Sequence, residues 1–130
     1  MQNRFMFRAW NKEAKTMHYS AEETYNGIFG NPKIEHTSFS GLLNDNQYII
    51  MQCTGLKDKT GKLIYEGDVV LFGSNPDDIA VIEWNKDECK FVVDEIFDNA
   101  ISDFSNWFGE DLEIIGNIYE NPDLIGGKKQ

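Results

Sequence analysis

The sequence has few of the residues that build reactive or cross-linked sites. It contains two cysteines, Cys53 and Cys89, two histidines, His18 and His36, and three prolines. The cysteines lie far apart along the chain, and neither has a cysteine or histidine close by, which argues against a structural zinc site. Because we also find no export signal, we expect both thiols to be reduced.

Long apolar runs are absent as well. No segment approaches the ~18 apolar residues that a membrane-spanning helix needs. Residues 1–15 carry scattered charges and no apolar stretch before a small-residue cleavage site, so they do not resemble a signal peptide. We therefore expect a cytoplasmic protein with no membrane partner, and a chain of 130 residues fits one domain.

Motifs for catalysis or cofactor binding are also missing. The isolated glycines form neither a phosphate-binding loop nor a dinucleotide fingerprint. Both histidines stand in polar stretches without pattern, and adjacent acids such as Asp77 and Asp78 would point to opposite faces of a strand. We therefore expect no catalytic, cofactor-binding or metal-ligating residue, and we interpret the protein as a non-enzyme.

The chain does contain ample apolar residues in the pattern of β strands. Hydrophobic residues make up 41% of it, including nine phenylalanines. Short apolar segments separated by turn residues indicate a mostly-β fold, either a small barrel or a sandwich. The predicted strands are residues 4–10, 17–19, 34–39, 48–53, 69–72, 79–84, 89–96 and 112–120.

One segment changes to the period of a helix. Phe97, Ile101, Phe104 and Phe108 follow the spacing of one helical face, and Gly109 suits the position just beyond a helix end. The sequence thus predicts one short helix over residues 97–108.

The negative charge is concentrated in the second half of the chain. Of the 22 acids and 12 bases, eight of each lie in residues 1–75, which leaves fourteen acids and four bases in residues 76–130. An aromatic side chain ringed by acids is typical of an interface for a basic protein. The predicted partner-binding residues are Asp94, Glu95, Asp98, Asp103, Trp107, Glu110 and Asp111.

Other interpretations of these residues stay open. The acidic side chains could form only a solvated face, and the aromatic residues could close one end of the core. In a sharper variant the acidic face mimics DNA. Nucleic acid is disfavoured as a partner because an acidic surface repels phosphate. The alternative function is nucleic-acid binding through the neutral half, with a patch formed by Arg4, Arg8, Trp10, Lys57, Lys59 and Lys62.

Three segments of the chain resemble one protein family. Residues 7–17 read FRAWNKEAKTM, residues 48–70 read YIIMQCTGLKDKTGKLIYEGDVV, and residues 112–124 read LEIIGNIYENPDL. In this order they are similar to the YopX family of phage and prophage proteins. Residues 20–46 and 97–110 match no pattern of that family.

The resemblance implies a fold and an origin but no activity. It implies a small SH3-like barrel with an N-terminal β-rich extension, in an accessory protein carried by a phage or prophage. We therefore expect a single domain over residues 1–130, with an N-terminal part at 1–46, a barrel part at 47–124 and a frayed tail at 125–130. The expected partner is a host or phage protein, and homo-oligomers are compatible with this interpretation.

Overall fold

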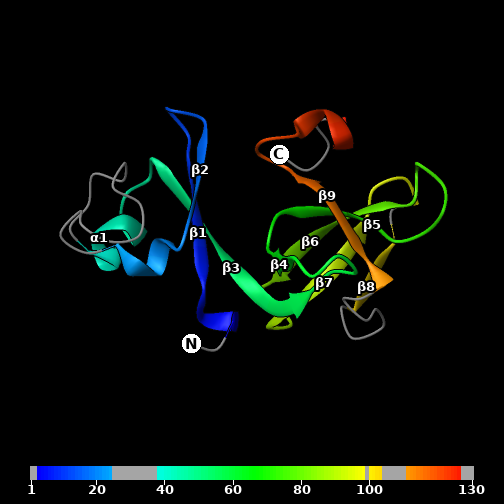
Figure 1. Ribbon diagram of the computed structural model, residues 1–130, viewed down its shortest axis with the longest axis horizontal. Coiled ribbons are helices and arrows are strands. Elements are labelled where there is room, and N and C mark those ends of the chain that lie inside the picture. Colours follow the sequence, from blue (N-terminus) through cyan, green and yellow to red (C-terminus); the bar gives the residue numbers. More distant parts are fainter. Residues whose placement is uncertain (1–2, 25–37, 99, 104–110, 127–130) are drawn as a thin grey trace.

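The strands form two antiparallel sheets in the computed structural model, which describes residues 3–24, 38–98, 100–103 and 111–126 (Figure 1). The first sheet has the order β2-β1-β3-β4 and the second the order β8-β7-β6-β5-β9. The first sheet consists of β1 (Phe7–Asn11), β2 (Thr16–Tyr19), β3 (Tyr48–Lys57) and β4 (Leu63–Tyr65). The second consists of β5 (Asp68–Leu71), β6 (Ile79–Asn85), β7 (Lys90–Glu95), β8 (Ile101–Asp103) and β9 (Glu113–Asn117).

In the described part of the chain, four short helical segments accompany the sheets. They are η1 (Asn3–Phe5), η2 (Ala21–Glu23), α1 (Phe39–Leu43) and η5 (Pro122–Ile125). The α-helix begins after Ser38, whose hydroxyl accepts a hydrogen bond from the Gly41 N–H at 3.1 Å. This bond satisfies one of the amides that a helix start leaves unpaired.

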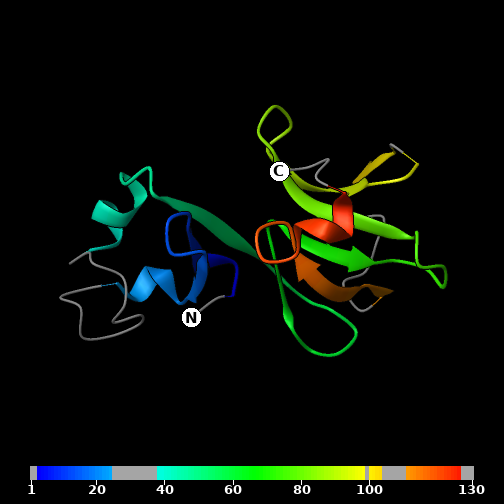
Figure 2. The ribbon, with the colours of Figure 1, turned by 90° about the horizontal axis from the view of Figure 1, so that it is seen from above.

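The molecule has two lobes joined by the long strand β3 (Figures 1 and 2). The N-terminal lobe comprises β1, β2, α1 and the first half of β3. The barrel lobe comprises β4 to β9 and η5. Strand β3 pairs with β1 through Tyr48–Gln52 and with β4 through Cys53 and Lys57, so one strand contributes to both lobes.

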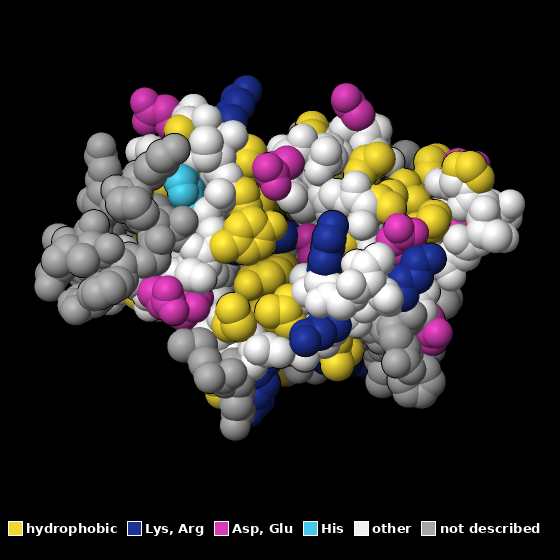
Figure 3. Space-filling view, in the orientation of Figure 1, with side chains coloured by type: hydrophobic (Ala, Val, Ile, Leu, Met, Phe, Trp, Pro, Cys, Tyr) yellow, Lys and Arg dark blue, Asp and Glu magenta, His cyan; other side chains and the backbone are white. Residues whose placement is uncertain are grey.

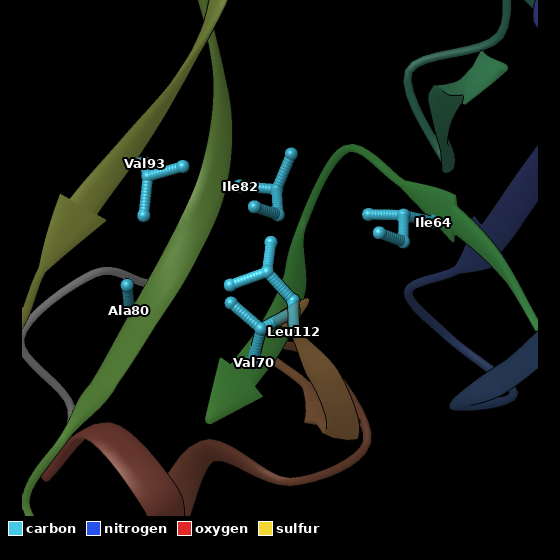
Figure 4. Close-up of a cluster of buried hydrophobic side chains, with 6 residues drawn as sticks. All are labelled: Ile64, Val70, Ala80, Ile82, Val93 and Leu112. Carbon is cyan, nitrogen blue, oxygen red and sulfur yellow. The ribbon is translucent and has the colours of Figure 1, made fainter. Parts of the chain in front are cut away.

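Each lobe has its own apolar core. Alternate residues of a strand point to opposite faces, and β5 and β6 are buried on both. One face packs Val70 and Ile82 against Leu112, and the other packs Val69 and Val81 against Ile118. Figure 4 shows the first cluster, with Ile64 of β4 joining side chains from the neighbouring strands. The N-terminal lobe packs Ala9, Ala21, Leu42 and Tyr48 in a smaller core.

Several turns are held by the same side-chain-to-backbone hydrogen bonds. The side-chain oxygen of an Asn or Asp at the turn start accepts backbone N–H bonds from residues two to four positions later. Asn11 does this between β1 and β2, Asp58 between β3 and β4, Asn85 between β6 and β7, and Asn117 after β9. These polar residues determine where strands end.

The mostly-β class is confirmed. The five-stranded sheet curls like half of a barrel, which is compatible with the SH3-like architecture expected from the sequence (Figure 2). The burial of Val69 and Val70, and the hairpin turn with Gly61 at φ +93°, also agree with the sequence pattern.

The predicted helix at 97–108 is wrong in its described part. Residues 101–103 form β8, where Ser102 pairs with Val93 of β7, and Phe97 and Asp98 lie in the preceding turn. Residues 99 and 104–108 lie outside the described residues. The side chains of Phe97 and Ile101 are 50% and 64% exposed, so no core covers these two members of the apolar stripe on which the prediction rested.

Two smaller predictions also need correction. The strand expected at residues 34–39 ends in a helix start instead, because Phe39 begins α1; residues 34–37 lie outside the described residues. Residue 125 does not belong to a frayed tail, because the Ile125 side chain is buried in the second barrel cluster at 1% exposure; residues 127–130 lie outside the described residues.

Candidate functional site

Two surfaces carry the candidate chemistry: the edge of the barrel lobe at β8, and a cleft between β4 and β9 beside the N-terminal lobe. The first contains the described members of the predicted acidic set. Trp107 and Glu110 lie outside the described residues, and Asp111 is exposed just before β9.

Asp94 does not belong to an exposed face. It lies in β7 with 4% of its surface exposed, so it is not accessible to a partner in this structure. Val92, Val93 and Asp94 are all buried, so this part of β7 is covered on both faces and alternation gives Asp94 no exposed side.

Glu95 and Asp98 lie near one another at the turn of the β7–β8 hairpin, whereas Asp103 lies farther along β8, opposite Val92. Partial burial, and then the neighbouring carboxyl group of Asp98, raise the pKa of Glu95. Asp103 of β8 forms an ion pair with Lys90 of β7, which also contacts Glu88. The hairpin therefore carries more acid than base.

Apolar side chains stand among these acids. Phe97 is 50% exposed, and Ile101 is 64% exposed on the same face of β8 as Asp103, two residues later. We call Glu95, Phe97, Asp98, Ile101 and Asp103 the acidic edge. Among the described strands, β8 is the last of its sheet.

The second surface is a cleft of about 730 Å³ between the edge strands β4 and β9, to which Arg8 and Tyr19 of the N-terminal lobe also contribute. Leu63 and Tyr65 of β4 line one side and residues 114–117 of β9 line the other, and each strand is the last of its sheet. In Figure 3, basic side chains gather beside hydrophobic ones where the lobes meet.

A buried ion pair closes the floor of this cleft. Arg8 of β1 contacts Asp68 of β5 at 2.8 Å (Nη1–Oδ1) and donates from Nη2 to the Glu66 carbonyl at 3.0 Å. The guanidinium group also lies 4.9 Å from the ring centre of Tyr65 and 5.8 Å from that of Tyr19. Both charged side chains are only 2–3% exposed, so this pair joins the lobes away from water.

Burial shifts the titration of the groups around this joint. It raises the pKa of Asp68 to about 6, although Arg8 and the Tyr65 N–H act in the opposite direction. It raises the pKa of the Tyr65 hydroxyl to about 12 and also raises the pKa of Glu66. At neutral pH the Asp68 carboxyl group is therefore mainly ionised, and the Tyr65 hydroxyl keeps its proton.

The β3–β4 hairpin closes one end of the cleft. The Asp58 carboxylate accepts a hydrogen bond from the Ile114 N–H at 2.9 Å, and the Lys59 N–H donates to the Leu112 carbonyl at 2.9 Å. A second inter-lobe contact is the stack of Trp10 on Tyr119, with ring centres 5.8 Å apart.

The residues of the alternative nucleic-acid patch do not form one surface. Arg8 and Trp10 are buried, at 2% and 9% exposure. Lys59 pairs with Glu113 at 3.4 Å, whereas Lys57 and Lys62 line the cleft. Arg4 instead stacks over the Phe5 ring.

The histidines and cysteines that the structure describes form no reactive cluster with one another. His18 is 8% exposed, and its Nε2 lies 2.8 Å from the Thr16 hydroxyl oxygen. Burial raises the pKa of the Cys53 thiol, and Cys89 is exposed; both thiols are free. His36 lies outside the described residues. In the described ranges no three His, Cys, Asp or Glu side chains gather as a metal site would require, and no helix could cross a membrane.

Sequence patterns alone did not predict the cleft. Its lining comes from β1, β2, β3, β4, β5, β9 and the turns that follow β3 and β9, and several of these segments are far apart in the chain. The sequence signal for it was that the alternative nucleic-acid patch already grouped Arg8, Lys57 and Lys62.

The fold resembles solved structures of two bacterial proteins. Protein EF1440 from Enterococcus faecalis is 27% identical, with a TM-score of 0.59, and the match covers 92% of this chain and 96% of that one. Protein yopX from Bacillus subtilis is 20% identical, with a TM-score of 0.57, covering 93% and 98%. No curated protein matches the chain. The family model described as YopX protein matches residues 6–126, and the chain therefore belongs to the YopX family.

Proposed function

We propose that this chain is a non-enzymatic protein-binding module that acts as an accessory protein of a phage or prophage in the cytoplasm of its bacterial host. Its binding surface is the acidic edge, and its partner is a basic segment of a host or phage protein. One observation carries the proposal: Phe97 and Ile101 are 50% and 64% exposed on a hairpin that carries the carboxylates of Glu95, Asp98 and Asp103.

The chemistry of the acidic edge defines the partner. Burying the exposed parts of two large apolar side chains is favourable by roughly 25 cal/mol per Å² of apolar surface. Glu95, Asp98 and Asp103 would orient Lys or Arg side chains and exclude acidic segments, so they supply specificity more than affinity. An extended segment in which apolar and basic residues alternate fits this surface best, because it could add as a strand beside β8.

Two carboxyl groups whose pKa values are shifted, those of Asp58 and Asp68, support a non-enzymatic role. Asp58 accepts backbone bonds in a turn, and Asp68 pairs with Arg8 in the joint between the lobes. Each carboxyl group therefore already has a structural task. The acidic edge and the cleft also differ in the sign of their net charge, which favours a basic partner at the acidic edge.

Removal of the acidic charges tests the proposal. A partner is first captured from host lysate after nuclease treatment and identified, and its affinity is then measured by calorimetry at two salt concentrations. We compare the wild type with the variant Glu95→Gln/Asp98→Asn/Asp103→Asn. The matched control removes three exposed acids elsewhere and is Asp77→Asn/Asp87→Asn/Asp123→Asn.

We expect the edge variant to bind at least about tenfold more weakly and with less dependence on salt, because rim charges attract the partner through screened Coulomb forces. The control should bind like the wild type. Equal affinity of the edge variant and the wild type would contradict the proposal. Capture that requires nucleic acid would favour the alternative function through Lys57 and Lys62.

A further inference from the structure

The cleft between β4 and β9 shares no residue with the acidic edge, and a role for it goes beyond the proposed function. We propose that the cleft between β4 and β9 binds a small organic anion, a carboxylate or phosphate carried on a flat apolar group.

The dimensions of the cleft fit a ligand of this kind. Its volume of about 730 Å³ lies within the roughly 300–1,000 Å³ of small-molecule sites. The cleft is a permanent feature of the fold because it is closed at defined points, by Asp58 and Ile114 at the hairpin and by Arg8 and Asp68 at the floor. Such sites tend to occur where two structural units meet.

The local charge selects an anion. The lining includes three basic side chains, Arg8, Lys57 and Lys62, and two acidic ones, Asp68 and Glu120. The cleft is therefore net positive on a chain whose formal charge is −10. Neither lysine forms an ion pair with any residue in the described ranges, whereas Lys59 and Lys90 both do. A concave basic site on an acidic protein concentrates small anions.

An unpaired hydroxyl group on the mostly buried Tyr65 points to a hydrogen-bonding ligand. Tyr65 lines the cleft and is 4% exposed, and its hydroxyl has no hydrogen-bond partner among the residues that the structure describes. The fully enclosed unpaired side-chain atoms in that part of the chain are Arg8 Nε and Thr24 Oγ1, so the Tyr65 oxygen itself reaches open space. A protonated phenol in this position donates to an oxyanion, and buried polar groups are normally paired.

The apolar walls favour a flat group beside the anion. The Tyr19 ring is 49% exposed and packs edge-on against Tyr65, with ring centres 5.7 Å apart. Ile115 on the opposite wall is 37% exposed. A planar ring between these side chains would bury apolar surface, while its anionic group reached the two lysines.

Nuclear magnetic resonance with three matched probes tests the proposal. Uniformly 15N-labelled full chain is titrated with 1-naphthyl phosphate, 1-naphthoate and 1-naphthol. We expect saturable shifts of the amides of Leu63, Ile115 and Gly116 with an anionic probe and none at the same concentration of 1-naphthol. The stronger of the two anions distinguishes phosphate from carboxylate recognition.

Variants distinguish the site from general attraction. Lys57→Gln/Lys62→Gln should weaken binding about tenfold, because two charge-assisted contacts are lost. Tyr65→Phe keeps the ring and should weaken binding several-fold. The control Lys12→Gln/Lys86→Gln removes two exposed lysines elsewhere, with the same change in net charge, and should bind like the wild type.

Three results would overturn the proposal: equal shifts with 1-naphthol, shifts that do not saturate, or equal weakening by the control variant. The acidic-edge variant should bind the probes like the wild type. Failure of the proposed protein-binding function would therefore be distinguishable from failure of this site.

Discussion

At the scale of single residues, Asp58 makes an unusually large number of backbone contacts. Its Oδ1 accepts from the Thr60 and Lys62 N–H groups and from the Thr60 hydroxyl, and its Oδ2 accepts from the Ile114 N–H. Burial alone would raise its pKa, but the bonds from Ile114, Thr60 and Lys62 outweigh burial and lower it. One carboxylate thus holds its own turn and attaches that turn to β9.

Asp58→Asn should destabilise the protein. The amide NH₂ group would face the Ile114 N–H, two donors without an acceptor, at a cost of about 1–3 kcal/mol. Urea denaturation at pH 7 measures the loss, and Asp87→Asn, at an exposed position, is the control and should change stability by less than about 0.5 kcal/mol. The pKa of Asp58 is lowered in the fold, so its contribution is present above the unfolded value and is lost as pH falls. Equal stability of both variants would contradict this role.

At the scale of elements, the turn between β4 and β5 is held by Gly67. Its φ is +88°, and a Cβ atom there would lie 3.1 Å from Met51 Sδ and 3.6 Å from Arg8 Nη2. The turn therefore approaches the N-terminal lobe closely. Its N–H group also donates to the Ile82 carbonyl at 2.7 Å.

A pair of glycine substitutions separates backbone strain from crowding. Gly67→Ala and Gly61→Ala both force alanine into the left-handed region, which costs roughly 1–2 kcal/mol. Gly61 has φ +93° but no atom within 4 Å of the added Cβ. We expect the larger loss of melting temperature for Gly67→Ala, because Met51 and Arg8 must also move. Equal losses in calorimetry would show that the approach of the lobes is unimportant there.

The β7–β8 hairpin shows why a helical period can mislead. The aromatic spacing at 97–108 suited a helix, but the backbone of residues 101–103 pairs with β7 instead. Ile101→Thr should therefore change the free energy of unfolding by less than about 0.5 kcal/mol, as expected for an exposed side chain. Val93→Thr places a hydroxyl in the core and should cost about 1–3 kcal/mol. A large loss for Ile101→Thr in urea denaturation would argue for a buried helical face.

At the scale of the whole molecule, Arg8 and Asp68 couple the two lobes. Arg8→Met should cost about 3–5 kcal/mol, because it leaves the Asp68 carboxylate buried without its cation. Asp68→Asn can still accept from the Tyr65 N–H but leaves Arg8 unpaired. The double variant should lose less stability than the sum of the single losses, as measured by urea denaturation in a double-mutant cycle. Strict additivity would indicate that the lobes do not depend on this pair.

The same pair predicts a dependence of stability on pH. Burial raises the pKa of Asp68 from its ordinary value of 3.8 to about 6, so the folded state holds a proton that the unfolded state releases between these values. Its contribution is complete below pH 4 and is lost as pH rises toward 6. The stability of the wild type relative to Asp68→Asn should therefore fall by about 3 kcal/mol between pH 4 and pH 7. A relative stability that rises over this range in urea titrations would contradict the burial of this carboxyl group.

The sequence by itself determined the class of the fold, the position of most strands and the family. Alternating apolar residues and Asn or Asp turns act locally, so strands such as 48–53 and 79–84 and the turn at Asp58 are readable from neighbouring residues. Only the tertiary structure decided that Asp94 and Arg8 are buried and that Ile101 is exposed. Burial depends on which distant strand covers a side chain, and edge pairing depends on which strand is available. The cleft was unreadable for the same reason, because Lys57, Tyr65 and Ile115 become neighbours only when two sheet edges are placed side by side.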